Sequence, residues 1–98
     1  MAFFQVLFSK KAERDFKDLT VEEQLAVGQG IRLLETNPFP FKKKIKKIQG
    51  SREPLHRLRV DLRSQSYRIF YAVQKPNQVI VLRLVPKKEA DRVLTRLL

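Results

Sequence analysis

The chain has 98 residues, of which 43% are hydrophobic and 32% charged, and it contains no cysteine. This composition excludes disordered and collagen-like proteins, and it leaves no disulfide framework, thiolate zinc site or cysteine nucleophile. The formal net charge is +11, which favours a polyanionic or acidic partner. The length suits one core, so we expect a single domain over residues 1–98.

The N-terminal residues predict a strand followed by a short helix. Ala2–Phe8 is aromatic and β-branched, and its alternate side chains Phe4, Val6 and Phe8 share one face. Ser9 is a candidate N-cap. Beyond it, apolar side chains recur at helical spacing up to residue 20. These positions are Ala12, Phe16 and Leu19.

A second helix is predicted to begin at Thr20, because Glu23 three residues later completes a capping box. Gly30 lies within its apolar stripe, where glycine costs about 1 kcal/mol relative to alanine. We therefore expect another backbone to approach Gly30 closely. The stripe consists of Ala26, Val27, Gly30, Leu33 and Leu34. Two prolines within residues 37–40 end the helix.

The second half of the chain predicts a loop, three strands and a helix. Residues 41–54 form a lysine-rich loop anchored by Ile45 and Ile48. Period-two patterns then predict strands at 55–62, 67–73 and 79–85, and an amphipathic helix follows Pro86. The order β-α-α-β-β-β-α indicates an α+β fold. It has an antiparallel sheet, an N-terminal helical hairpin on one face and a short C-terminal helix.

The positive charge is concentrated in one third of the chain. Residues 42–68 hold ten basic and two acidic side chains, a net charge of +8. Such a segment repels itself unless it faces a polyanion or an acidic protein, so nucleic acid is the natural partner. General solubility is the alternative explanation. Apolar runs are far shorter than the roughly 20 residues of a membrane span, so we expect a cytoplasmic protein without membrane contact.

The sequence offers few groups for familiar catalytic sites. His56 is the sole histidine, and no glycine-rich phosphate-binding motif occurs. We therefore expect neither a bound metal nor a cofactor. The alternation of side chains places His56 on the face of Leu58 and Val60, which favours a core histidine over a catalytic one.

Three arginines are predicted to converge on one sheet face. Arg57 and Arg59 alternate with apolar core positions of their strand, and Arg68 points away from the larger apolar set of the next strand. If these strands form a hairpin, the three guanidinium groups meet on the open face. Guanidinium groups match phosphate bidentately, which favours a phosphate ligand. A solvated polar face with salt bridges at its rim is the alternative.

Several segments in order resemble the RelE/ParE toxin superfamily over nearly the whole chain. They are Phe3–Phe8, the helical hairpin ending in Asn37-Pro38, Lys47-Ile48-Gln49-Gly50, Leu58-Arg59-Val60 and Ser66-Tyr67-Arg68-Ile69-Phe70-Tyr71. The resemblance implies a type II toxin neutralised by a cognate antitoxin. In the RelE branch it implies a metal-independent endoribonuclease that cuts mRNA in the ribosomal A site and inhibits translation.

The resemblance also implies roles for basic residues. Arg68 matches the sheet arginine of the RelE branch, Lys88 matches its second basic residue ahead of the last helix, and Arg57 and Arg59 stand where that branch places strand lysines or arginines. We assign Arg68 and Lys88 to phosphate stabilisation, and Arg59 and Arg57 to orientation of the substrate and tuning of pKa values. We assign sequence-independent RNA contact, which should weaken steeply with salt, to eight further side chains. These are Lys42, Lys43, Lys44, Lys46, Lys47, Arg63, Arg83 and Lys87.

One position departs from the family pattern. Leu94 stands where RelE-like proteins often carry a catalytic tyrosine, and leucine has no proton to offer. The general acid and base therefore stay unassigned. Two alternative functions remain open at this point, a ParE-like inhibitor of DNA gyrase and a catalytically weak RNA-binding homologue of the toxins.

Overall fold

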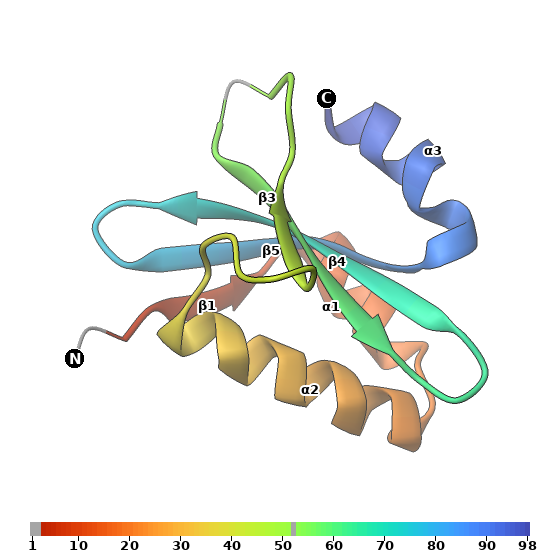
Figure 1. Cartoon of the computed structure of the whole chain (residues 1–98). Helices are drawn as coiled ribbons and strands as arrows, with labels where there is room; N and C mark the ends of the chain where they lie inside the picture. The colour runs from red at the N-terminus through yellow and green to blue at the C-terminus, as the bar shows by residue number, and fades with distance from the viewer. Residues whose placement is uncertain (1–2, 52) are drawn as a thin grey trace.

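A computed structural model describes residues 3–51 and 53–98 as five strands and three helices (Figure 1). In chain order they are β1 (Gln5–Phe8), α1 (Lys10–Lys17), α2 (Val21–Thr36), β2 (Ile45–Lys47), β3 (Leu55–Asp61), β4 (Ser66–Gln74), β5 (Gln78–Pro86) and α3 (Lys87–Leu97). The strands form one sheet in the order β1-β5-β4-β3-β2. Within the described residues, no helix is long and apolar enough to span a membrane.

The sheet is mixed, which corrects the prediction of a purely antiparallel one. The predicted meander is confirmed, since β4 pairs antiparallel with both β3 and β5. However, β1 pairs parallel with β5. Tight turns force neighbouring strands to run antiparallel, whereas two helices separate β1 from the meander and allow either direction.

A second correction concerns the segment predicted as a loop. Residues 45–47 form β2, an edge strand that pairs antiparallel with β3. Ile45 is buried opposite Leu58 in this pairing. The segment is too short and too rich in lysine to show strand periodicity, so the partner strand stabilises what local sequence does not indicate.

The helix starts follow the predicted caps. The backbone N–H of Ala12 donates to Ser9 Oγ over 3.1 Å. At α2, Glu23 N donates to Thr20 Oγ1 and Thr20 N donates to Glu23 Oε1, which confirms the capping box. The helix ends at Thr36, before the prolines, as predicted. The predicted start of the first strand at Ala2 lies outside the described residues.

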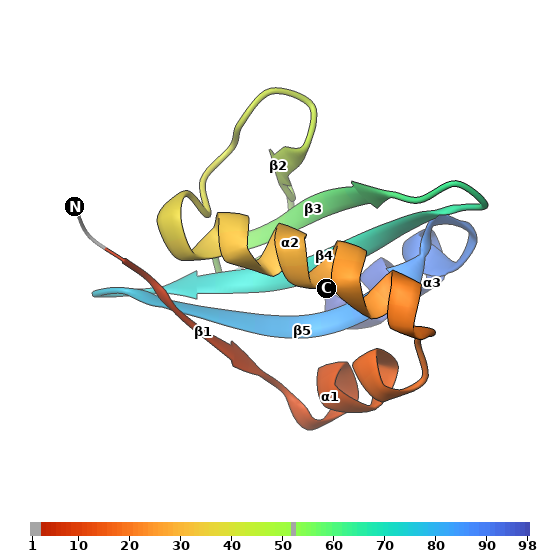
Figure 2. The ribbon, with the colours of Figure 1, turned by 90° about the horizontal axis from the view of Figure 1, so that it is seen from below.

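Helices cover both faces of the sheet, as Figure 2 shows with α2 in front of the strands and α3 behind them. The larger core lies under α1 and α2 and includes Val27, Leu34 and Tyr71. On the opposite face, α3 packs Ala90 and Val93 over strand residues in a smaller core. The face that we expected to stay open is therefore partly covered, because the apolar side of α3 also needs burial.

Gly30 lies where α2 contacts β3, but the approach is by side chains and not by the predicted backbone. A Cβ at Gly30 would lie 3.0 Å from Leu58 Cδ2 and 3.1 Å from Val60 Cγ2, whereas one at Gly28 meets nothing within 4 Å. Both neighbours of Gly30 are buried core residues with little room to move. Glycine at this position thus lets α2 lie close to the sheet.

These two glycines give a matched pair of substitutions. Gly28→Ala should stabilise the protein by about 0.5–1 kcal/mol, because alanine loses less conformational entropy in a helix. Gly30→Ala should instead destabilise it by about 1 kcal/mol, since crowding of a packed core exceeds the helical gain. Urea unfolding of both variants checks this, and equal stabilisation by the two would contradict the close packing at Gly30.

Candidate nucleic-acid interface

The predicted convergence of three arginines on one sheet face is confirmed. Arg57 and Arg59 lie on β3, and Arg59 is directly opposite Arg68 of β4 in the strand register. Burial lowers the pKa of Arg68, and the positive charges of Arg57 and Arg59 lower it further. The sheet therefore holds three guanidinium groups together against their mutual repulsion.

Arg68 is buried, contrary to the open position that we expected. Only 6% of the residue is exposed. Its Nη1 donates to Ser66 Oγ over 2.6 Å and to the carbonyl of Tyr67 over 3.2 Å. The Ser66 hydroxyl in turn donates to Asp61 Oδ1 over 2.7 Å. This chain of bonds fixes the orientation of the Arg68 guanidinium.

The two arginines of β3 keep donors without hydrogen-bond partners. Nε of Arg57 and Nε of Arg59 are both buried and make no hydrogen bond within the described part of the chain. Arg59 Nε lies 3.3 Å from Asp61 Oδ2, close enough for an ion pair but not aligned for a hydrogen bond. A buried donor without a partner is costly, so these two side chains lower the stability of the fold.

A cavity of about 340 Å³ lies beside Arg57, between α3 and the β2–β3 edge, whereas Arg59 lines a separate cavity between β3 and α2. Lys46 and Arg57, which are paired in the strand register, line one side together with Lys47. Asp91 and Leu94 of α3 line the other side. The cavity therefore offers several cations next to the buried cluster and is wide enough for a nucleotide.

A second basic cavity, of about 430 Å³, lies at the start of α3. It is lined by Lys87 and Lys88, by Gln65 and Ser66 from the start of β4, and again by Asp91. We expected Lys88 to precede the last helix, but it belongs to the first turn of α3. The Ser66 hydroxyl connects this cavity to Arg68.

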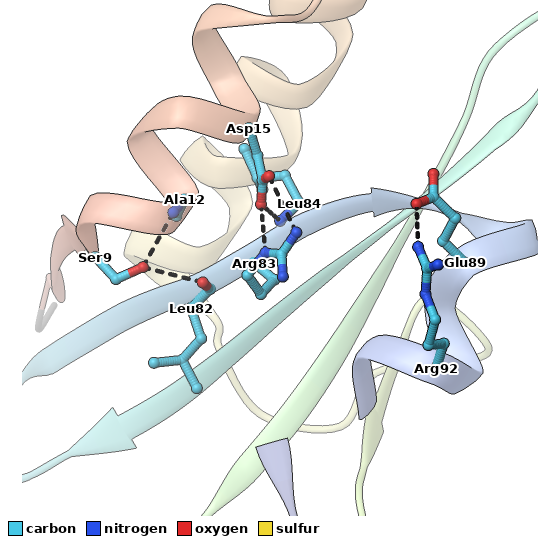
Figure 3. Close-up of polar contacts among 8 residues, drawn as sticks. All are labelled: Ser9, Ala12, Asp15, Leu82, Arg83, Leu84, Glu89 and Arg92. Carbon is cyan, nitrogen blue, oxygen red and sulfur yellow. Dashed lines mark hydrogen bonds and ion pairs between the residues drawn. The ribbon is translucent and has the colours of Figure 1, made fainter. Parts of the chain in front are cut away.

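The other basic residues that we assigned to RNA contact fall into two groups. Lys42, Lys43 and Lys44 are exposed in the segment before β2, and Arg63 is exposed in the β3–β4 turn. Arg83 is instead occupied by an ion pair, since its Nε donates to Asp15 Oδ2 over 2.8 Å (Figure 3). This hydrogen bond raises the pKa of Arg83. We therefore leave Arg83 out of the proposed RNA-contacting surface.

The histidine and both tyrosines lie on the opposite face of the sheet. His56 is buried and stacked on Tyr71, with a distance of 5.5 Å between ring centroids, which confirms it as a core residue. Burial lowers its pKa. Tyr67 donates its hydroxyl to Glu23 on α2, and burial followed by this bond raises the pKa of Tyr67 to about 12. These groups therefore serve packing and not the basic cavities.

Sequence reasoning missed the residues that support the arginine cluster. Asp61 and Ser66 are paired in the β3–β4 register and orient Arg59 and Arg68. The predicted hairpin contained a signal for this pair, since both residues lie at its closed end. Asp91 was also missed, because it belongs to no recognisable motif in the sequence. Its position three residues before Leu94 places both on one helix face.

The geometry defines a class of protein, a small basic α+β fold whose sheet holds an arginine cluster beside two cationic cavities. Comparison with known proteins gives the family. Residues 14–95 match the family model of "Phage derived protein Gp49-like (DUF891)". The protein named "Putative toxin RelE1" of Methanocaldococcus jannaschii is 31% identical over 87 residues, 88% of this chain and 91% of the relative. The chain therefore belongs to the Gp49/RelE-like family of type II toxins.

Solved structures agree on the fold. The toxin-antitoxin complex RelBE2 from Mycobacterium tuberculosis matches with a TM-score of 0.71 and 20% identity, over 88% of this chain and all of that chain. The RelB-RelE antitoxin-toxin complex from Methanococcus jannaschii matches with a TM-score of 0.66 and 24% identity, over 89% and 96% of the respective chains. Both toxins were thus crystallised with an antitoxin.

Proposed function

We propose that this toxin is a ribosome-dependent endoribonuclease that cuts mRNA in the A site and so inhibits translation. The observation that carries the proposal is the arginine cluster. In this cluster the buried, oriented Arg68 of β4 lies directly opposite Arg59 of the neighbouring strand β3. Such an arrangement strains the fold by desolvation and like-charge repulsion. A phosphate between the guanidinium groups would relieve both.

The proposed reaction needs alignment and charge stabilisation. A ribose 2′-hydroxyl attacks the neighbouring phosphate, and negative charge builds up on the phosphorane-like transition state. Arg68, held by Ser66 and the Tyr67 carbonyl, supplies a preorganised cation for this charge. Arg57 and Arg59 orient the phosphate through their positive charge on the same sheet face, and Lys88 lies in the adjoining cavity to contact it. The ribosome completes the site and excludes water.

Ribosome association would use the exposed lysines around β2. Lys42, Lys43 and Lys44 are exposed before the buried Ile45, and Lys46 and Lys47 are exposed after it and line the first cavity. Together with Arg63 and Lys87, they would contact ribosomal RNA through phosphates without reading its sequence. Each such contact releases counterions, so binding should depend strongly on salt.

The partner in the cell would be a cognate antitoxin, as in the complexes of the similar toxins. A cavity of about 370 Å³ between α2 and β3 offers a surface for it, lined by Ala26, Leu33 and Val60 among others. An amphipathic helix or an added strand suits such a groove beside a sheet edge. Acidic side chains on the antitoxin would complement the surrounding lysines.

Expression in cells tests this function. Induction of the protein should stop protein synthesis and produce codon-phased cuts in mRNA, while DNA supercoiling stays normal. Co-expression of the neighbouring reading frame as antitoxin should restore growth. Cleaved DNA bound to gyrase, with mRNA intact, would contradict the proposal and support the ParE-like alternative. A protein that binds ribosomes without stopping synthesis would indicate the weak RNA-binding homologue.

A further inference from the structure

Asp91 of α3 lines both basic cavities. It lines the first cavity opposite Arg57 and the second beside Ser66. Of the described residues that line these two cavities, Asp91 alone carries a carboxylate. Its side chain is exposed and forms no ion pair with any described residue. A negative group thus faces a surface that is otherwise built for anions.

The lysines of the two cavities carry a proton already at neutral pH, and other side chains near the arginine cluster that could accept one lie elsewhere or are occupied. His56, Tyr67 and Tyr71 belong to the opposite face of the sheet. Asp61 already accepts a hydrogen bond from the Ser66 hydroxyl at Oδ1, and its Oδ2 forms an ion pair with Arg59. The arginines stay protonated in proteins and are poor general bases. Asp91 therefore has both the chemistry and the free oxygens that proton transfer needs.

The helix places Asp91 next to the position where the family tyrosine is missing. Asp91 and Leu94 are three residues apart on α3, so they lie on one face about one turn apart. Both line the first cavity. A substrate that reaches the side chain at position 94 therefore also passes the carboxylate at position 91.

We propose that Asp91 is a catalytic residue that takes the proton from the attacking ribose 2′-hydroxyl. This inference rests on the ribonuclease function proposed above. The new bond joins the 2′-oxygen to phosphorus, and the bond from phosphorus to the 5′-oxygen breaks. The proton passes from the 2′-hydroxyl to an Asp91 oxygen and is then lost to solvent, while the departing 5′-oxygen takes up a proton from solvent. The products are a 2′,3′-cyclic phosphate and a 5′-hydroxyl, and no other reactant is consumed.

Charged groups around Asp91 suit this role. Lys46, Lys47 and Arg57 face it across the first cavity, and Lys87 and Lys88 share the second cavity with it. On its own helix, Glu89 and Arg92 form an ion pair with each other. The phosphate of the substrate and the Asp91 carboxylate are both negative and repel each other. The cations around the carboxylate offset this repulsion and keep the phosphate near it.

Cleavage of mRNA in programmed ribosomes, measured in a single turnover with saturating toxin, tests the proposal. Asp91→Asn should cut about 100-fold more slowly or worse, the usual contribution of a general acid or base. Its association with ribosomes should be unchanged or tighter, because one negative charge is removed. Asp91→Glu should keep most of the rate.

Glu89→Gln is the matched control, since it removes a carboxylate from the same helix outside both cavities. It should cut at the parent rate. The role of Asp91 is overturned if the parent cuts and Asp91→Asn cuts as fast, or if the variant keeps its rate but changes the preferred base at the cut. A parent that leaves mRNA on the ribosome intact would overturn the ribonuclease function itself, and this inference with it.

Discussion

Arg68→Met is expected to stabilise the fold while it slows mRNA cleavage by about 100-fold or more. Burial and the charges of Arg57 and Arg59 lower the pKa of Arg68, so the folded state disfavours its charge. Methionine has a stem of similar length and no charge to desolvate, and such replacements of buried charge are often stabilising by at least about 1 kcal/mol. The loss of rate follows because a preorganised cation is removed from the developing phosphorane.

Thermal unfolding and single-turnover cleavage, measured on the same preparations, check this prediction. A gain of 1 kcal/mol should raise the melting temperature by about 4–8 °C for a chain of this size. Arg32→Met is the control, because Arg32 is an exposed arginine of α2 outside the arginine cluster and both basic cavities. It should change neither quantity. An Arg68→Met variant that melts lower and still cleaves would show that Arg68 is structural.

Local signals in the sequence located most of the fold, because their physical causes are local. Ser9 and the pair Thr20 and Glu23 satisfy helix N–H groups within three residues, so the caps could be recognised directly. Period-two alternation likewise marked the meander. The parallel pairing of β1 and the short strand β2 depend on partners distant in sequence, for which the chain carries no local signal.

The candidate site was only partly predictable for a similar reason. Alternation along β3 and β4 was enough to place Arg57, Arg59 and Arg68 on one face. The burial of Arg68 was missed because it depends on the tertiary surroundings of β4, which no local pattern in the sequence encodes. The same limit applies to Arg83, whose partner Asp15 lies on α1, 68 residues away.

Asp15 connects α1 to β5 and is expected to be the most sensitive polar position of the fold (Figure 3). Its carboxylate accepts from Arg83 Nε over 2.8 Å and from the backbone N–H of Leu84 over 2.9 Å. The side chains of Asp15 and Arg83 are only 17% and 23% exposed. Removal of the carboxylate would therefore leave both a guanidinium and a backbone donor poorly solvated and without their partner.

Asp15→Ala should lower the free energy of unfolding by about 2–4 kcal/mol, since breaking a largely buried ion pair strands the remaining charge. Glu89→Ala provides the control, because Glu89 forms an equally short 2.7 Å pair with Arg92 at the surface, where the side chains are 38% and 65% exposed. That change should cost no more than about 0.5 kcal/mol. Urea unfolding of the two variants measures the difference. Equal losses would show that burial of the Asp15 pair does not decide its contribution, and that α1 is held on β5 by apolar packing alone.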